Sequence, residues 1–88
     1  MTIIHPKATV SAWAELKDGV VALAGAVINA NTKVGHNVII NAIVEHDCDI
    51  GNHAHVAPGC YIAGEARIGE GTFLGRALIL MDASFKLF

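Results

Sequence analysis

The stretch from Val44 to Gly69 reads VEHDCDIGNHAHVAPGCYIAGEARIG and carries an aliphatic residue at every sixth position. The same step of six runs through the rest of the chain, with one interruption between Ile40 and Val44, where the step is four. The repeated positions are Ile4, Val10, Leu16, Ala22, Ile28, Val34, Ile40, Val44, Ile50, Val56, Ile62, Ile68, Leu74 and Leu80. Thirteen of these fourteen are Ile, Val or Leu, whereas random placement would put roughly four there. The six-residue period is therefore the dominant signal in the chain.

A second set of positions, two residues before each aliphatic, repeats with it. Eleven of these fourteen residues are Ala, Thr or Cys. Because side chains alternate between the two faces of a strand, both members of each pair point to the same side. Residues that tolerate the left-handed backbone of a tight corner often follow the aliphatic, namely Gly35, Gly51, Gly69, Gly75, Asn29 and Asn41. The pattern predicts short strands that each bury one large and one small side chain.

Three such strands with their corners make one coil of 18 residues, so the sequence predicts an all-β fold, a triangular parallel β-helix of about four to five coils. A helix is excluded because residues spaced by six form no stripe on a 3.6-residue wheel. An antiparallel sandwich would need longer strands and hairpin turns. We expect Cys48 and Cys60, both in the small inward class, to serve as buried apolar fillers.

Composition narrows the possible partners. The 88 residues carry a net charge of −2 and a pI of about 6.2, which gives no basic surface for nucleic acid or an anionic membrane. The longest uncharged apolar run, Val20 to Ile28, is shorter than the roughly 20 residues that span a bilayer. The first seven residues lack the shape of a signal peptide. These features predict a soluble, cytoplasmic protein without nucleic-acid or membrane partners.

The hexapeptide pattern resembles the hexapeptide-repeat acyltransferases. Within them, the run Ile43-Val44-Glu45-His46-Asp47-Cys48-Asp49-Ile50-Gly51, followed by His55-Val56-Ala57-Pro58-Gly59 and Ala63-Gly64, is similar to the acetyltransferase domain of the sialic acid O-acetyltransferase and nucleotide-sugar N-acetyltransferase group. The opening Ile4-His5-Pro6 also resembles the start of that domain, and the resemblance extends to about Leu80. It implies a left-handed β-helix, a homotrimer, acetyl-CoA as co-substrate and a sugar or related small molecule as acceptor, with nucleotide sugars among the candidates.

His46 is the candidate general base, because acyl transfer to a hydroxyl or amine needs a group that accepts a proton near neutral pH. The resemblance implies that Asp47 orients the ring and stabilises its charged form, and that the amide of Gly64 stabilises the negative charge on the thioester oxygen. Gly64 lies 18 residues after His46, and the repeat alone predicts that the two stack. The resemblance also implies contacts from His55, Gly64 and Arg76 to acetyl-CoA. We expect direct transfer in a ternary complex.

The sequence leaves other interpretations open. His5, His36 and His53 are expected to face solvent, and Glu45 to be a solvated neighbour of His46. The chain could also be an assembly module without activity, or could hold zinc between subunits through His46, His53 or His55, as carbonic anhydrases of this fold do. The outward aliphatic residues favour association of copies, and they include Val21, Leu23, Val27, Ile39 and Ile43.

Two features depart from the family pattern. Two residues are missing between Asn41 and Ala42, so either the corner absorbs the loss or the coil deforms and displaces His46. The nucleotide-sugar-binding βαβ domain that usually precedes these coils is not found before Ile4, and the repeat ends after Leu80. We divide the chain into a β-helix of residues 1–81 and a tail of residues 82–88, which we expect to cover the last coil.

Overall fold

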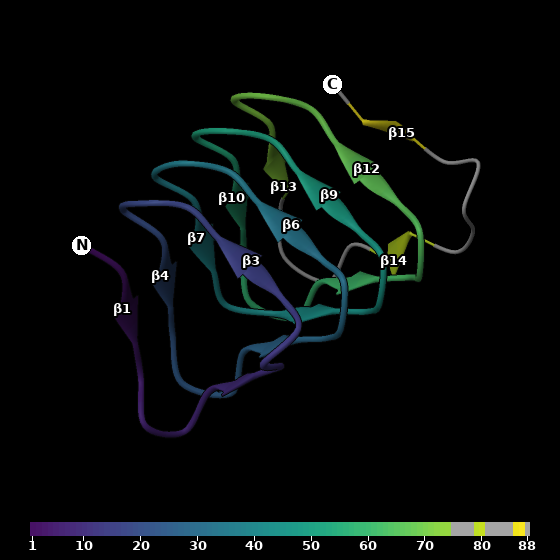
Figure 1. Cartoon of the computed structure of the whole chain (residues 1–88). Coiled ribbons are helices and arrows are strands. Elements are labelled where there is room, and N and C mark those ends of the chain that lie inside the picture. The colour runs from purple at the N-terminus through teal and green to yellow at the C-terminus, as the bar shows by residue number, and fades with distance from the viewer. Residues whose placement is uncertain (75–78, 81–85, 88) are drawn as a thin grey trace.

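The computed structural model describes residues 1–74, 79–80 and 86–87 of the chain, and in these residues every regular element is a two-residue strand. The strands form three parallel sheets, which are the faces of a three-sided coil (Figure 1). Sheet A contains β1 (Ile3–Ile4), β4 (Val21–Ala22), β7 (Ile39–Ile40), β10 (His55–Val56) and β13 (Phe73–Leu74). Sheet B contains β2 (Thr9–Val10), β5 (Val27–Ile28), β8 (Ile43–Val44), β11 (Tyr61–Ile62) and β14 (Ile79–Leu80). Sheet C contains β3 (Glu15–Leu16), β6 (Lys33–Val34), β9 (Asp49–Ile50), β12 (Arg67–Ile68) and β15 (Lys86–Leu87).

This arrangement confirms the predicted parallel β-helix of hexapeptide repeats. The register is also the one that the six-residue step requires, since Val44 pairs with Ile62, Ile50 with Ile68, and Val56 with Leu74. The described residues include no helix that could span a membrane. The expected tail of residues 82–88 lies outside the described residues apart from Lys86–Leu87, whose strand pairs with β12. Its role as a cover for the last coil stays a prediction.

The core consists of the two inward positions of each repeat. The large side chains Ile28, Ile40, Ile50 and Ile62 are completely or almost completely buried, and the small residues beside them are buried as well. Cys48 and Cys60 belong to this small set and form no disulfide, as expected. Burial raises the pKa of the Cys48 thiol, which disfavours the reactive thiolate. The cysteines therefore pack as small buried side chains, and the Cys48 thiol also donates a hydrogen bond to the Ala63 carbonyl over 3.2 Å.

The missing pair of residues is absorbed at the corner between β7 and β8, where only Asn41 and Ala42 separate the two strands. Strand β8 still pairs in register with both neighbours, because Ile43 lies beside Val27 on one side and Tyr61 on the other. Ile43 and its partner Val27 in the coil below are 16 residues apart in sequence, whereas Ile43 and its partner Tyr61 in the coil above are 18 apart. The coil that carries His46 thus keeps the parallel stacking of its neighbours.

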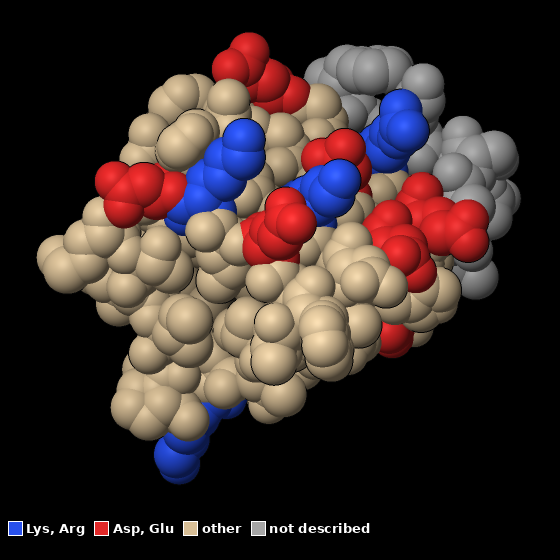
Figure 2. Space-filling model, viewed as in Figure 1, with Lys and Arg blue, Asp and Glu red and all other residues tan. Residues whose placement is uncertain are grey.

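The three outer faces differ in character. Sheets A and B present mainly apolar residues outward, and those exposed by more than a third include Ile3, Ile39, Ile43, Tyr61 and Phe73. Sheet C instead presents Glu15, Lys33, Asp49 and Arg67 at successive paired positions, so the sign of the charge alternates from strand to strand. Figure 2 shows acidic and basic side chains interleaved on the side where Figure 1 places sheet C. Two faces are thus suited to burial and one to solvent.

We predict that Lys33→Glu lowers the free energy of unfolding on the order of 1 kcal/mol at low salt, because it puts three negative side chains on consecutive strands. Urea denaturation at low and at high salt measures this effect, and salt should remove most of it. Lys33→Gln, which removes the positive charge without adding a negative one, is the control and should lose less. Equal stability of the two variants at low salt would contradict the prediction.

Candidate functional site

The candidate site is built on the turn of residues 45–48, which joins β8 of sheet B to β9 of sheet C. Asp47 has a φ of 59°, a left-handed conformation that Asp adopts more readily than most residues. The coil below holds the turn through a hydrogen bond of 2.9 Å from the Asp47 amide to the Ala30 carbonyl. The coil above holds it through a bond of 3.0 Å from the Glu65 amide to the His46 carbonyl. The backbone that carries His46 is therefore fixed on both sides.

His46 and Asp47 form a pair whose geometry determines which ring nitrogen is available. Nδ1 of His46 lies 2.9 Å from Oδ2 of Asp47, and the histidine side chain is 59% exposed. A carboxylate can only accept a hydrogen bond, so in the neutral ring Nδ1 carries the hydrogen and Nε2 has a free electron pair. The hydrogen bond to Asp47 raises the pKa of His46 above its usual value, and nearby Glu45 and Glu65 add to this effect.

Gly64 lies directly against the imidazole from the next coil. A Cβ atom at this position would be 2.8 Å from both Cε1 and Nε2 of His46, a separation that real Cβ atoms do not adopt. Glycine is thus required for the ring to occupy this place. The N–H of Gly64 donates to no acceptor among the residues that the structure describes. Within the described residues, an amide without an acceptor and the imidazole of His46 therefore occupy the same corner on adjacent coils.

Glu45 differs from the sequence-based expectation of a solvated side chain. Its carboxylate accepts a hydrogen bond of 2.8 Å from Nδ2 of Asn29 and one of 2.7 Å from the hydroxyl of Tyr61. These partners belong to the coils below and above, so Glu45 links three consecutive coils beside His46. The 16-residue spacing from Asn29 to Glu45 is a signal for this contact, but only once the shortened coil is known to keep its register.

The remaining predicted residues lie elsewhere. His55 is on β10 of sheet A, where its ring meets Phe73 edge-on with 4.8 Å between ring centroids. A shallow groove there is lined by His55, Ala57, Pro58 and Phe73. This face is separate from the corner of His46, so one chain does not bring these two histidines together. Arg76 lies outside the described residues.

The remaining histidines bear on the alternative of a zinc site between copies. His5, His36 and His53 are exposed, as expected. Within the described part of one chain, no group of three His, Cys, Asp or Glu side chains could hold a metal ion. His46, His53 and His55 follow or belong to different strands around the coil, so a zinc site would need ligands from more than one copy.

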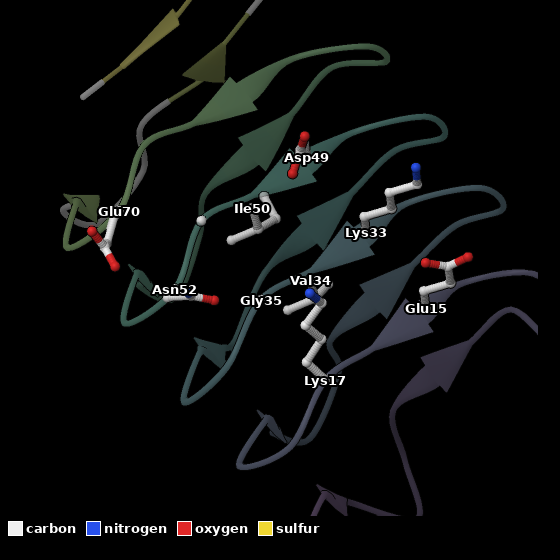
Figure 3. A pocket seen from close by; sticks show the side chains of 10 residues that line it. Glu15, Lys17, Lys33, Val34, Gly35, Asp49, Ile50, Asn52 and Glu70 are labelled. Carbon is white, nitrogen blue, oxygen red and sulfur yellow. The ribbon is translucent and has the colours of Figure 1, made fainter.

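A second groove runs over sheet C (Figure 3). Its charged lining comes from Glu15, Lys17, Lys33, Asp49 and Glu70, while His46, Asp47 and Gly64 are not part of it. Figure 3 shows Glu15, Lys33 and Asp49 on three neighbouring strands. Because both signs of charge alternate here, the groove favours neither an anionic nor a cationic ligand.

Comparison with known proteins identifies relatives with the same fold. The chain is 28% identical over 82 residues to the GDP-perosamine N-acetyltransferase of Escherichia coli O157:H7, which covers 91% of this chain and 37% of that protein. The acetyltransferase domain of PglB from Neisseria gonorrhoeae FA1090, solved in complex with acetyl coenzyme A, is 37% identical with a TM-score of 0.92. That match covers 93% of this chain and 41% of the PglB chain. The chain is a relative of the hexapeptide-repeat acyltransferases.

A third match extends this relationship. PerB from Caulobacter crescentus, solved in complex with CoA and GDP-perosamine, is 30% identical with a TM-score of 0.56, over 89% of this chain and 50% of that one. No protein-family model matches the chain. The chain spans half or less of the length of each of these three relatives. The resemblance inferred from the Glu-His-Asp run is thus confirmed, for a region that corresponds to part of each acetyltransferase.

We predict that Asp47→Asn moves the pKa of His46 down towards its ordinary value, since the charged hydrogen-bond acceptor is lost. Asparagine also adopts left-handed backbone conformations, so the turn should persist. Titration of the imidazole signals by NMR measures the change, with exposed His53 as an internal control. An unchanged pKa of His46 would show that the pair does not exist in solution.

Proposed function

We propose that the chain is the catalytic β-helix of an acetyl-CoA-dependent O- or N-acetyltransferase that acts on a sugar or related small molecule, such as a nucleotide sugar. The observation that carries the proposal is the position of His46, with Nδ1 bound to Asp47 and Nε2 beside Gly64. The relatives support it, because two are N-acetyltransferases of GDP-perosamine or bind it, and the PglB domain binds acetyl coenzyme A.

In this mechanism Nε2 of His46 removes the proton from the acceptor hydroxyl or amine as its oxygen or nitrogen attacks the thioester carbonyl carbon. Asp47 stabilises the resulting imidazolium through Nδ1. A positioned general base is typically worth about 10²–10⁴ in rate. The protonated ring then returns its proton to the departing sulfur of CoA, so the residues end the cycle unchanged. Attack is direct, since both cysteine side chains are buried and neither can serve as an acyl carrier.

The amide of Gly64 would donate a hydrogen bond to the thioester oxygen as that oxygen gains negative charge. Removal of one side-chain donor from such an oxyanion-binding site costs roughly 10²–10³ in kcat in another enzyme. The Gly64 amide can make this contribution only if it is unpaired before the reaction. It has no acceptor among the described residues, which supports the role. Base and donor would thus act on the same acyl group from adjacent coils.

We further propose that the active unit is a homotrimer in which sheet A of one copy packs on sheet B of the next. The apolar outer faces of these two sheets support this arrangement, while charged sheet C would remain in solvent. Each contact would put His55 and Phe73 of one copy near the edge of sheet B that ends at His46 in the neighbouring copy. His55 and Arg76 could then contact acetyl-CoA bound between copies.

We predict that His46→Ala lowers kcat by about 10²–10⁴ and leaves the affinity for acetyl-CoA nearly unchanged, because the base is removed but the binding surface is not. Steady-state kinetics with a nucleotide amino sugar and calorimetric titration with acetyl-CoA test both parts. His53→Ala is the matched control and should behave as the wild type.

The acid limb of the pH profile gives an independent check. Because the pKa of His46 is raised, the neutral base is lost as the pH falls through a value above that of free histidine. Absence of acetyl-CoA binding by the wild type would contradict the proposal and favour the assembly module. Metal that copurifies in stoichiometric amount and is lost in His46→Ala would favour the zinc site.

For the trimer, we predict a mass of about three chains of 9.2 kDa by light scattering, and monomers after Ile39→Glu combined with Ile43→Glu, which put charge on both apolar faces. Lys33→Gln on sheet C is the control and should stay trimeric. A wild type with the mass of one chain at all concentrations would contradict the assembly.

A further inference from the structure

Thr32 is exceptional among the core residues, being the only polar or charged residue that is buried in the part of the chain that the structure describes. It occupies the small inward position before β6, where the following coil has Cys48 and the next has Ala66. Burying a hydroxyl in an aliphatic core is unfavourable unless the group is hydrogen-bonded. The position of its partners is therefore informative.

Both partners of the Thr32 hydroxyl belong to the turn that carries His46. Oγ1 donates to the carbonyl oxygen of Glu45 over 2.8 Å and accepts from the amide of Cys48 over 3.3 Å. These two groups are the ends of the 45–48 turn. Within the described residues, neither has another hydrogen-bond partner. One buried side chain thus joins the first and last residues of the turn from inside the core.

The outer contacts of the turn complete this arrangement. The middle of the turn is held by its bonds to Ala30 and Glu65, and the Glu45 carboxylate by Asn29 and Tyr61. Among the described residues, only Thr32 bonds to the Glu45 carbonyl and the Cys48 amide, the two groups that flank His46 and Asp47 in the turn. A displacement of about 1 Å at a catalytic group can cost 10²-fold in rate.

We propose that Thr32 is a positioning residue, whose buried hydroxyl fixes the 45–48 turn so that His46 lies between Asp47 and Gly64. This inference rests on the proposed function as far as turnover is concerned, but the placement of the ring can be measured without it. Thr32 does not touch the reacting groups. It acts through the backbone of Glu45 and Cys48.

The chain provides a matched control. Thr2 makes the same type of contact in the first coil, with Oγ1 donating to the Lys17 carbonyl over 3.2 Å, but it is exposed and far along the coil from His46. Thr2→Val therefore removes a comparable hydrogen bond without affecting the turn. Thr32→Val removes the hydroxyl with nearly the same volume, and Thr32→Ser restores it. Thr32→Cys is a second variant without the hydroxyl, of a residue type that packs at this position in the next coil.

We expect kcat to fall about 10- to 100-fold in Thr32→Val and Thr32→Cys, with the KM for acetyl-CoA within about twofold of the wild type. Thr32→Ser should retain most of the activity, and Thr2→Val all of it. By NMR, the amide of Cys48 should exchange faster in the two variants that lack the hydroxyl. The pKa of His46, which faces Asp47, Glu45 and Glu65, should drop towards its ordinary value in the same two variants only.

The outcomes separate the two proposals. If wild-type protein has no turnover but Cys48 exchange and the His46 pKa change as stated, the positioning role holds and the proposed function fails. If Thr32→Val and Thr32→Cys lose thermal stability but keep the wild-type kcat, pH profile and His46 pKa, Thr32 is only structural and the inference is overturned. Thr32→Ser is the control for misfolding, because it must recover the kcat, the slow exchange of the Cys48 amide and the raised pKa of His46.

Discussion

Main-chain hydrogen bonding between successive coils is the constraint on which the rest of the structure depends. Each coil donates to and accepts from its neighbours in parallel register, as in the 2.9 Å bond from the Glu45 amide to the Ile62 carbonyl. Corresponding residues in adjacent coils are consequently about 4.8 Å apart. Gly64 lies against the ring of His46 for this reason, although 18 residues separate them in sequence. The aliphatic core keeps this register, since a slip by one residue would turn the buried side chains outward.

The sequence determined the fold to a large extent, because the six-residue step is a direct consequence of strand alternation and three-sided coiling. The partners of Val44, Ile50 and Val56 could be named in advance for that reason. Two features could not be predicted from the sequence. A deletion of two residues is compatible with a shorter corner or with a deformed coil, and only the pairing of Ile43 with Val27 and Tyr61 distinguishes them. The bonds of Glu45 were missed because they depend on that register and on side-chain reach.

The candidate site combines an exposed imidazole with a backbone that is hydrogen-bonded on several sides. His46 is open to solvent, yet the turn beneath it is bound to the coil below, the coil above and the buried hydroxyl of Thr32. This arrangement explains how a two-residue loss close by can leave the histidine beside Gly64. The outer faces also separate the two candidate histidines, because His55 lies on an apolar face away from His46. In the proposed trimer, His55 of one copy would come near His46 of the next.

The most direct test of this account is a crystal structure of the protein with acetyl-CoA. We predict the acetyl carbonyl oxygen within hydrogen-bond distance of the Gly64 amide, Nε2 of His46 facing the side from which the acceptor would attack the acyl carbon, and Nδ1 still bound to Asp47. Coenzyme bound over sheet C or elsewhere, or an imidazole rotated away from Gly64 with its Asp47 contact broken, would contradict it.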